Sequence, residues 1–269
     1  MTASFALRTS SSRPENDHAG LTVQAWLAHS EHSNHNCAMR KEVFSIGSYV
    51  HIVHRGTRGS ALVRDEHDRR RFLKLLTYLN DEKVPRNWER EITREHVDAG
   101  YARPKHWPDR KPYVAVMAYC LLDNHFHLLL REEKERGIAR FMQRLCTSMA
   151  AHFNTRHKEN GSLFQGPYRA RVIEDDAYLQ YASAYVQVKN AFDRQRPSGK
   201  RLESENFKEL FARALADPFV SLGEYMGTRT PAIVDLNRCT EVLLTPQDFR
   251  SYAADVIAGR VKIDGGLEP

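Results

Sequence analysis

Residues 119–130 read YCLLDNHFHLLL, an apolar run that contains two histidines, His125 and His127. Residues two apart in a β-strand point to the same face, so these imidazoles are expected side by side, with Phe126 opposite. A single histidine in an apolar strand is usually a hydrogen-bonded core residue, but each of two buried histidines needs its own partner. The pair therefore indicates either hydrogen-bonded core residues or half of a divalent-metal site.

The composition is that of a packed globular chain with a mild excess of positive charge. It has 269 residues, of which 41% are hydrophobic and 28% charged, enough for one domain with extensions. The net charge of +6 permits a polyanionic partner without requiring one. Four cysteines without CxxC spacing argue against a zinc ribbon or a disulfide framework and favour reduced, cytoplasmic thiols. We expect no membrane partner, because no apolar run approaches the roughly 20 residues of a membrane span.

The first 38 residues are rich in Ser, His, Asn and Thr and are expected to form a disordered tail. Its His29, His32, His35 and Cys37 are close enough in sequence for a metal cluster. A polar tail with incidental histidines is the simpler interpretation. Domain-like sequence is expected to begin at Met39.

Hydrophobic periodicity divides the rest of the chain into short strands and amphipathic helices. Strands are predicted at 48–54, 113–119 and 125–131, and helices at 65–80, 137–158, 175–190, 203–215 and 246–257. Asp65 is expected to cap the first helix. The short connection 121–124 predicts antiparallel pairing of the strands that it joins. Residues 162–168 are interpreted as a loop, followed by a basic stretch at 169–171.

A polar, proline-punctuated insertion is predicted at about 83–112. Trp88 and Trp107 lie there among arginines and lysines. Aromatic residues interleaved with cations suit stacking on unpaired bases, but tryptophans that anchor an insertion to the domain would give the same pattern.

The order of these blocks resembles the single-tyrosine HUH transposases, in particular the REP-associated tyrosine transposase-like branch, over about 45–228. The matching blocks are YVHIVHRG (49–56), AYCLLDNHFHLLL (118–130), GSLFQGPYRAR (161–171), DAYL (176–179) with Tyr185, and PFVSLGEYMG (218–227). The resemblance implies an α+β fold, with a ferredoxin-like core whose antiparallel sheet is flanked by helices. The transposase domain would span 39–228 and a helical extension 229–269.

The resemblance also implies a chemistry. His125 and His127 would hold a divalent cation, Mg²⁺ or Mn²⁺, at the scissile phosphate of single-stranded or hairpin DNA. Tyr185 would attack that phosphate and form a 5′-phosphotyrosine intermediate, so that cleavage and rejoining serve DNA transposition. A phenol is a poor nucleophile unaided, which is consistent with a need for the metal. Tyr178 and Tyr181, on the same helix, are interpreted as packing residues.

One position departs from the family pattern. The family usually has Asn or Gln four residues after the nucleophile as a third metal ligand, and Lys189 stands there. An ammonium group cannot ligate a cation. Either Asn190 or Gln187 substitutes after a small rotation, or Lys189 binds the phosphate and the metal has two protein ligands. The remaining alternative is a domesticated, catalytically weak protein that binds hairpin DNA or RNA.

Other uses of an HxH motif fit less well. A histidine-triad hydrolase needs a third histidine at Leu129, and a cupin site needs a β-barrel rather than long helices. A replication initiator or relaxase would share the chemistry, but this length leaves no room for a helicase-like region. The sequence leaves open whether the protein is a monomer or a dimer. Cationic and aromatic residues expected to contact DNA are Arg55, Arg58, Arg144, Arg169, Arg171, Lys189, Trp88 and Trp107.

Overall fold

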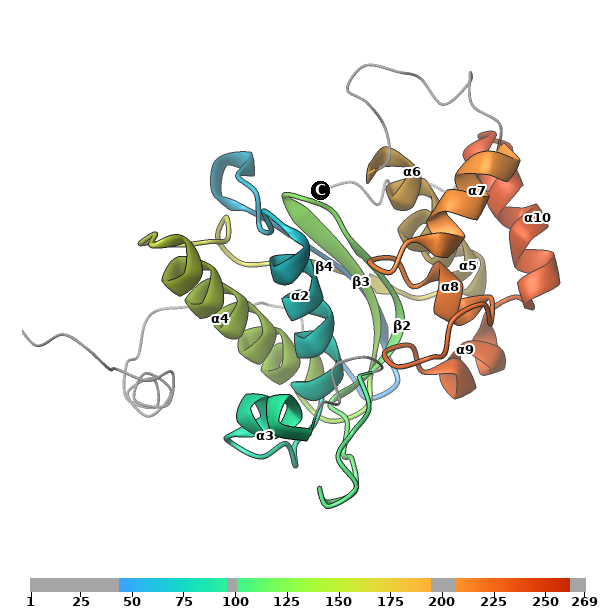
Figure 1. The fold of residues 1–269 in the computed structure, drawn as a ribbon. Coiled ribbons are helices and arrows are strands. Elements are labelled where there is room, and N and C mark those ends of the chain that lie inside the picture. Colours follow the sequence, from blue (N-terminus) through green and yellow to red (C-terminus); the bar gives the residue numbers. More distant parts are fainter. Residues whose placement is uncertain (1–43, 96–100, 195–206, 262–269) are drawn as a thin grey trace, which may run out of the picture. The chain divides into compact units, whose positions relative to one another are not determined.

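The computed structural model describes residues 44–95, 101–194 and 207–261. Its centre is a four-stranded antiparallel sheet with helices on both faces (Figure 1). The strands are β1 (Tyr49–Arg55), β2 (Val114–Leu121), β3 (His125–Glu132) and β4 (Arg169–Ile173), in the order β2-β3-β1-β4. α2 (Glu66–Tyr78) lies between β1 and β2 in the chain, and α4 (Gly137–His157) between β3 and β4. This β-α-β-β-α-β order is the ferredoxin-like arrangement that the family resemblance implied, and the fold class is α+β.

The register of the sheet decides which side chains share a face. In the β1–β3 pair, Val53 lies opposite His127 and His51 lies opposite Leu129. Paired residues of antiparallel strands project to the same side, so His51 and His127 are diagonal neighbours on one face. Phe126 lies opposite His54, and both project from the other face.

Helices α2 and α4 cover the Phe126 face of the sheet. The Phe72 ring of α2 lies 5.2 Å from the Phe126 ring. Asp65 caps α2 as predicted, because its side chain accepts a hydrogen bond from the backbone N–H of Asp68. The buried carboxylate of Glu132, at the end of β3, accepts from the first two backbone N–H groups of α4. This strand end therefore fixes where α4 begins.

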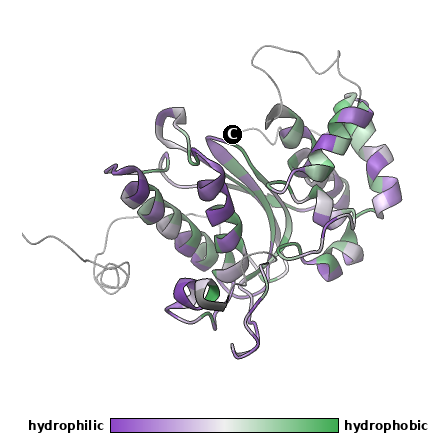
Figure 2. Ribbon diagram, viewed as in Figure 1, coloured by the Kyte–Doolittle hydropathy of each residue, from purple (hydrophilic) through white to green (hydrophobic). Residues whose placement is uncertain are grey.

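The opposite face carries the later helices. They are α5 (Asp176–Ala184), a π-helical turn η3 (Tyr185–Lys189), α6 (Asn190–Arg194), α7 (Phe207–Ala216), α8 (Leu222–Tyr225), α9 (Leu236–Val242) and α10 (Pro246–Ile257). Figure 2 shows apolar residues concentrated along the strands and on the helix sides that meet them. None of the helices within these described ranges is long and apolar enough to cross a membrane.

The segment between α2 and β2 contains α3 (Trp88–Glu95) and both tryptophans of the predicted insertion. Their rings lie 5.4 Å (Trp88) and 6.0 Å (Trp107) from the ring of Tyr78, and both are buried. The indole N–H of Trp107 donates to Glu91. Of the two interpretations, the structure supports packing on the domain, because buried indoles are not accessible to a base.

Most predicted elements are present, with the following differences. Strand β4 forms where a basic stretch after a loop was expected. The helix predicted at 175–190 is interrupted by the π turn and continues to Arg194. Helices α3, α8 and α9 were not predicted. The tail with His29, His32, His35 and Cys37 lies outside the described residues.

Candidate active site

Two buried histidines meet on the sheet face that carries α5 and η3. His51 and His127 are each 2% exposed. Nε2 of His51 lies 3.0 Å from Nδ1 of His127, and the rings are stacked with centroids 5.2 Å apart. Two neutral imidazoles share one proton across such a contact, so one ring donates and the other accepts.

Both rings are neutral at physiological pH. Burial lowers the pKa of His51 to about 4, and the positive charge of Arg171 acts in the same direction. Burial likewise lowers the pKa of His127 well below its usual value. A neutral imidazole is the form that ligates metal ions, so the site is ready to bind a cation without first losing a proton.

His125 lies at the start of β3 and is half-buried. Its ring is 5.0 Å from the ring of His127, edge to face. Nδ1 of His125 lies 2.7 Å from Oδ1 of Asn124 and donates to it, which places the lone pair of a neutral ring on Nε2. The two histidines of the HxH motif therefore project together, as predicted.

Tyr185 lies against the histidines from the helical layer. Its ring centroid is 5.8 Å from that of His127 and 6.1 Å from that of His51. The side chain is only 2% exposed. The structure thus brings the predicted nucleophile to the predicted metal ligand, although the two are far apart in the chain. The Tyr181 ring is tilted against the Tyr185 ring, with centroids 6.2 Å apart.

The π turn determines which residue lies one helical turn beyond Tyr185. In η3 the backbone N–H of Asn190, rather than that of Lys189, bonds to the carbonyl of Tyr185. A π turn holds one more residue than an α turn, so Asn190 takes the place that residue 189 would have in an α-helix. Lys189 remains close, with Nζ 4.7 Å from the Tyr185 ring centroid. Asn190 is 3% exposed, and its Nδ2 finds no hydrogen-bond partner among the described residues.

Comparison with known proteins agrees with this constellation. Residues 89–189 match the family model described as "Transposase IS200 like". The match includes His125, His127 and Tyr185. Over these residues the chain is similar to the IS200-like transposases.

A solved structure described as "Structure of the REP associates tyrosine transposase bound to a REP hairpin" also resembles the chain. The two are 12% identical, with a TM-score of 0.38 over 74% of this chain and 92% of the other. The fold assignment rests on the chain's own strand order. No curated protein sequence matches the chain.

Gln187, considered above as a substitute metal ligand, makes structural hydrogen bonds instead. It is fully buried, and its Nε2 donates to Ser183 Oγ while its Oε1 accepts from Ser221 Oγ. Ser221 Oγ in turn accepts from the backbone N–H of Tyr119 on β2. These bonds make Gln187 a bridge between the π turn and the sheet edge. Asn190 is the stronger candidate for a third ligand.

The cations predicted to contact DNA fall into two groups. Arg169 and Arg171 are exposed on β4, an edge strand, and Arg55 and Arg58 are exposed around the end of β1. Arg144 instead lies on α4 and donates to the Asp81 carbonyl oxygen, with its guanidinium over the Tyr113 ring. Its contacts are therefore internal.

Sequence reasoning missed the roles of His51 and of the π turn. The sequence pattern placed His51 in a predicted strand. Only the β1–β3 register shows that it is a diagonal neighbour of His127. The insertion of one residue into a helical turn leaves no periodic signal in a single sequence.

Proposed function

We propose that this protein is a metal-dependent, single-stranded DNA transposase and endonuclease that cleaves and rejoins DNA through a 5′-phosphotyrosine. The observation that carries the proposal is the approach of Tyr185 to His127, with ring centroids 5.8 Å apart, beside two further neutral or half-buried imidazoles. A nucleophilic side chain next to a metal-binding pair is the arrangement that this displacement needs.

The donor set fits a divalent cation such as Mg²⁺ or Mn²⁺. His125 donates from Nδ1 to Asn124, and His127 would donate from Nδ1 to His51, so each would offer Nε2 to the metal. Asn190 would add a carbonyl oxygen from the buried end of the π turn. When bound, the cation would act as a Lewis acid that offsets charge on the scissile phosphate and on the leaving oxygen.

The chain's own residues would carry out the displacement. The Tyr185 oxygen forms a bond to phosphorus while the bond from phosphorus to the 3′-oxygen breaks. The phenolic proton is released to solvent, and the departing 3′-oxygen takes up a proton. In the reverse step a 3′-hydroxyl attacks the phosphotyrosine, and Tyr185 recovers its proton. Because one phosphodiester-type bond replaces another, rejoining needs no external energy source.

Access to Tyr185 would require a local movement, because its side chain is 2% exposed. The π turn lies between α5 and α6 and changes the backbone hydrogen-bond register there. Such turns are frequent at functional sites. Lys189 lies over the Tyr185 ring and would meet the incoming phosphate as that ring turns outward.

Single-stranded or hairpin DNA would be held mainly through its phosphates. Exposed Arg55, Arg58, Arg169 and Arg171 could each neutralise one phosphate, which makes binding sensitive to salt. Arg169 and Arg171 are on the edge strand, and Arg171 also lies over the Tyr178 ring on the nucleophile helix.

The decisive test is to capture the covalent intermediate. The protein is incubated with single-stranded hairpin DNA labelled at the 5′ or the 3′ end, with Mn²⁺ or with EDTA. We expect an adduct that retains only the 3′ label, needs Mn²⁺ and disappears in Tyr185→Phe. The matched control Tyr181→Phe alters a neighbouring phenol of the same helix and should still form it.

A failure to form any adduct would overturn the nuclease proposal. If the same preparation still bound hairpin DNA or RNA, it would favour the catalytically weak binding protein. The buried Tyr185 and the lysine at position 189 are the observations that keep that alternative worth testing.

The third ligand has its own test. If Asn190 supplies it, Asn190→Ala should weaken Mn²⁺ binding at least tenfold, and Lys189→Asn should not strengthen it. If Lys189 marks a lost ligand, Lys189→Asn should instead raise the affinity.

A further inference from the structure

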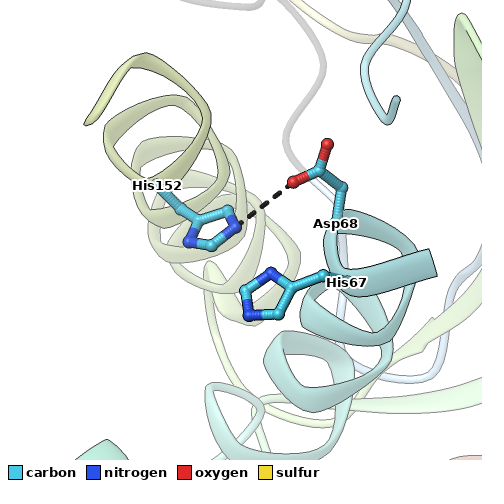
Figure 3. Close-up of side chains that lie close together, drawn as sticks. All are labelled: His67, Asp68 and His152. Carbon is cyan, nitrogen blue, oxygen red and sulfur yellow. Dashed lines mark ion pairs between the residues drawn. The ribbon is translucent and has the colours of Figure 1, made fainter. Parts of the chain in front are cut away.

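A second group of metal-ligating side chains lies between α2 and α4. His67 and Asp68 are in the first turn of α2, and His152 is on α4 (Figure 3). These helices cover the Phe126 face of the sheet, whereas Tyr185 lies against the His127 face. The group is therefore separate from the candidate active site.

The geometry of the three side chains is that of converging donors. One ligand atom from each lies within 4.8 Å of the other two. His152 Nε2 is 3.4 Å from Asp68 Oδ1, and the two imidazoles are stacked with centroids 5.3 Å apart. His152 Nε2 is buried and makes no hydrogen bond within the part of the chain that the structure describes. Figure 3 shows the three side chains pointing toward one another across the space between the helices.

We propose that His67, Asp68 and His152 form a zinc-type divalent cation site that joins α2 to α4. Two imidazole nitrogens and one carboxylate oxygen are a ligand set that zinc commonly accepts. Ligand distances of roughly 2.0–2.2 Å put neighbouring donors of a tetrahedral site about 3.3 Å apart. The separation between His152 Nε2 and Asp68 Oδ1 already matches this spacing. The side chain of His67 is exposed and can rotate to bring its ring nitrogen to the same distance.

Hydrogen bonds from neighbouring groups fix the orientation of the Asp68 carboxylate, as metal binding requires. Its Oδ2 accepts from the backbone N–H of Arg64 at 2.9 Å and from His157 Nε2 at 2.8 Å. Its Oδ1 accepts from Arg156 Nη1 at 2.9 Å and faces His152 with its other lone pair. Outer contacts of this kind fix the orientation of a metal-binding carboxylate.

The nearby positive charges are largely offset. Arg156 also pairs with Asp65, Arg71 pairs with Glu89 and Arg64 pairs with Glu159. A cation between the helices therefore meets ion pairs rather than isolated guanidinium groups. Exposed His67 leaves a route for the metal and space for water as the fourth ligand.

The site would contribute to stability rather than to strand transfer. Helices α2 and α4 belong to the two crossover connections of the core, so an ion held by both restrains their packing. A ligand that binds only the folded chain raises the melting temperature with its concentration.

The test uses the full chain, freed of metal with a chelator and then titrated with Zn²⁺ and with Co²⁺. We measure binding by calorimetry, the visible absorption of Co²⁺ and the melting temperature. His67→Ala removes one ligand from an exposed position, and His152→Gln removes another if the first variant is uninformative. His106→Ala, an exposed histidine elsewhere with 58% of its side chain accessible, is the matched control.

We expect His67→Ala to weaken one Zn²⁺-binding event at least tenfold and to abolish the corresponding rise in melting temperature. His106→Ala should retain both effects. The proposal is overturned if His67→Ala and His152→Gln bind Zn²⁺ and gain thermal stability as the unmodified chain does.

Discussion

Replacing His51 with phenylalanine should weaken metal binding although His51 is not expected to touch the metal. The substitution keeps an aromatic ring stacked on His127 but removes the acceptor 3.0 Å from its Nδ1. His127 then has a buried donor without its partner and loses the bond that fixes its tautomer and ring orientation.

The size of the effect follows from that single hydrogen bond. A buried donor left unsatisfied costs about 1–3 kcal/mol of folding stability. Loss of an outer partner of a metal-binding histidine typically lowers metal affinity about 10–100-fold, equivalent to about 1.4–2.7 kcal/mol. We therefore expect Mn²⁺ affinity and the free energy of unfolding to fall together.

Calorimetric Mn²⁺ titration and urea unfolding measure the two quantities. His51→Gln places an amide oxygen near the original acceptor and should recover most of the metal affinity. His54→Phe is the matched control, because His54 lies on the same strand but projects to the other face, toward Cys146 and the Gly166 carbonyl. It should lower stability and leave Mn²⁺ affinity unchanged. Wild-type Mn²⁺ affinity in His51→Phe would refute the reasoning.

Three other predictions concern stability, pH and DNA. Glu224→Gln should cost about 1.5–3 kcal/mol in urea unfolding, because the buried carboxylate accepts three backbone N–H groups and the Tyr119 hydroxyl, and the amide that replaces it has one acceptor oxygen and no charge. The metal-free protein should become less stable as the pH falls from 6.5 to about 4, and His51 should account for about 3 kcal/mol of the loss, since the unfolded chain binds a proton there that the folded chain excludes. The lowered pKa of His127 adds to the loss in the same direction. An equal pH dependence in His51→Phe would contradict the contribution of His51. Arg171→Ala should reduce the salt dependence of single-stranded DNA binding by about one ion in a fluorescence titration, and an unchanged slope would exclude it as a phosphate contact.

The local patterns in the sequence were sufficient to predict much of the fold. Period-two and period-3.6 hydrophobicity identified three of the four strands and the two long crossover helices, because burial of one face imposes that periodicity. Asp65 revealed a helix start through its capping chemistry. Strand β4 was not predicted, because RARVI (169–173) is a short edge strand with two exposed arginines. Edge strands bury little and so carry a weak hydrophobic pattern.

Some features of the candidate site also follow from the sequence, and others depend on the tertiary structure. The HxH spacing alone placed His125 and His127 on one face of a strand, since that geometry is a property of any strand. The contact of His51 with His127 depends on the β1–β3 register, and the approach of Tyr185 depends on how the helical layer packs on the sheet. The position of Asn190, one turn after Tyr185, depends on one π turn. Only the tertiary structure decides these contacts of the site. They bring together residues through long-range strand pairing and helix packing, which local periodicity does not reveal.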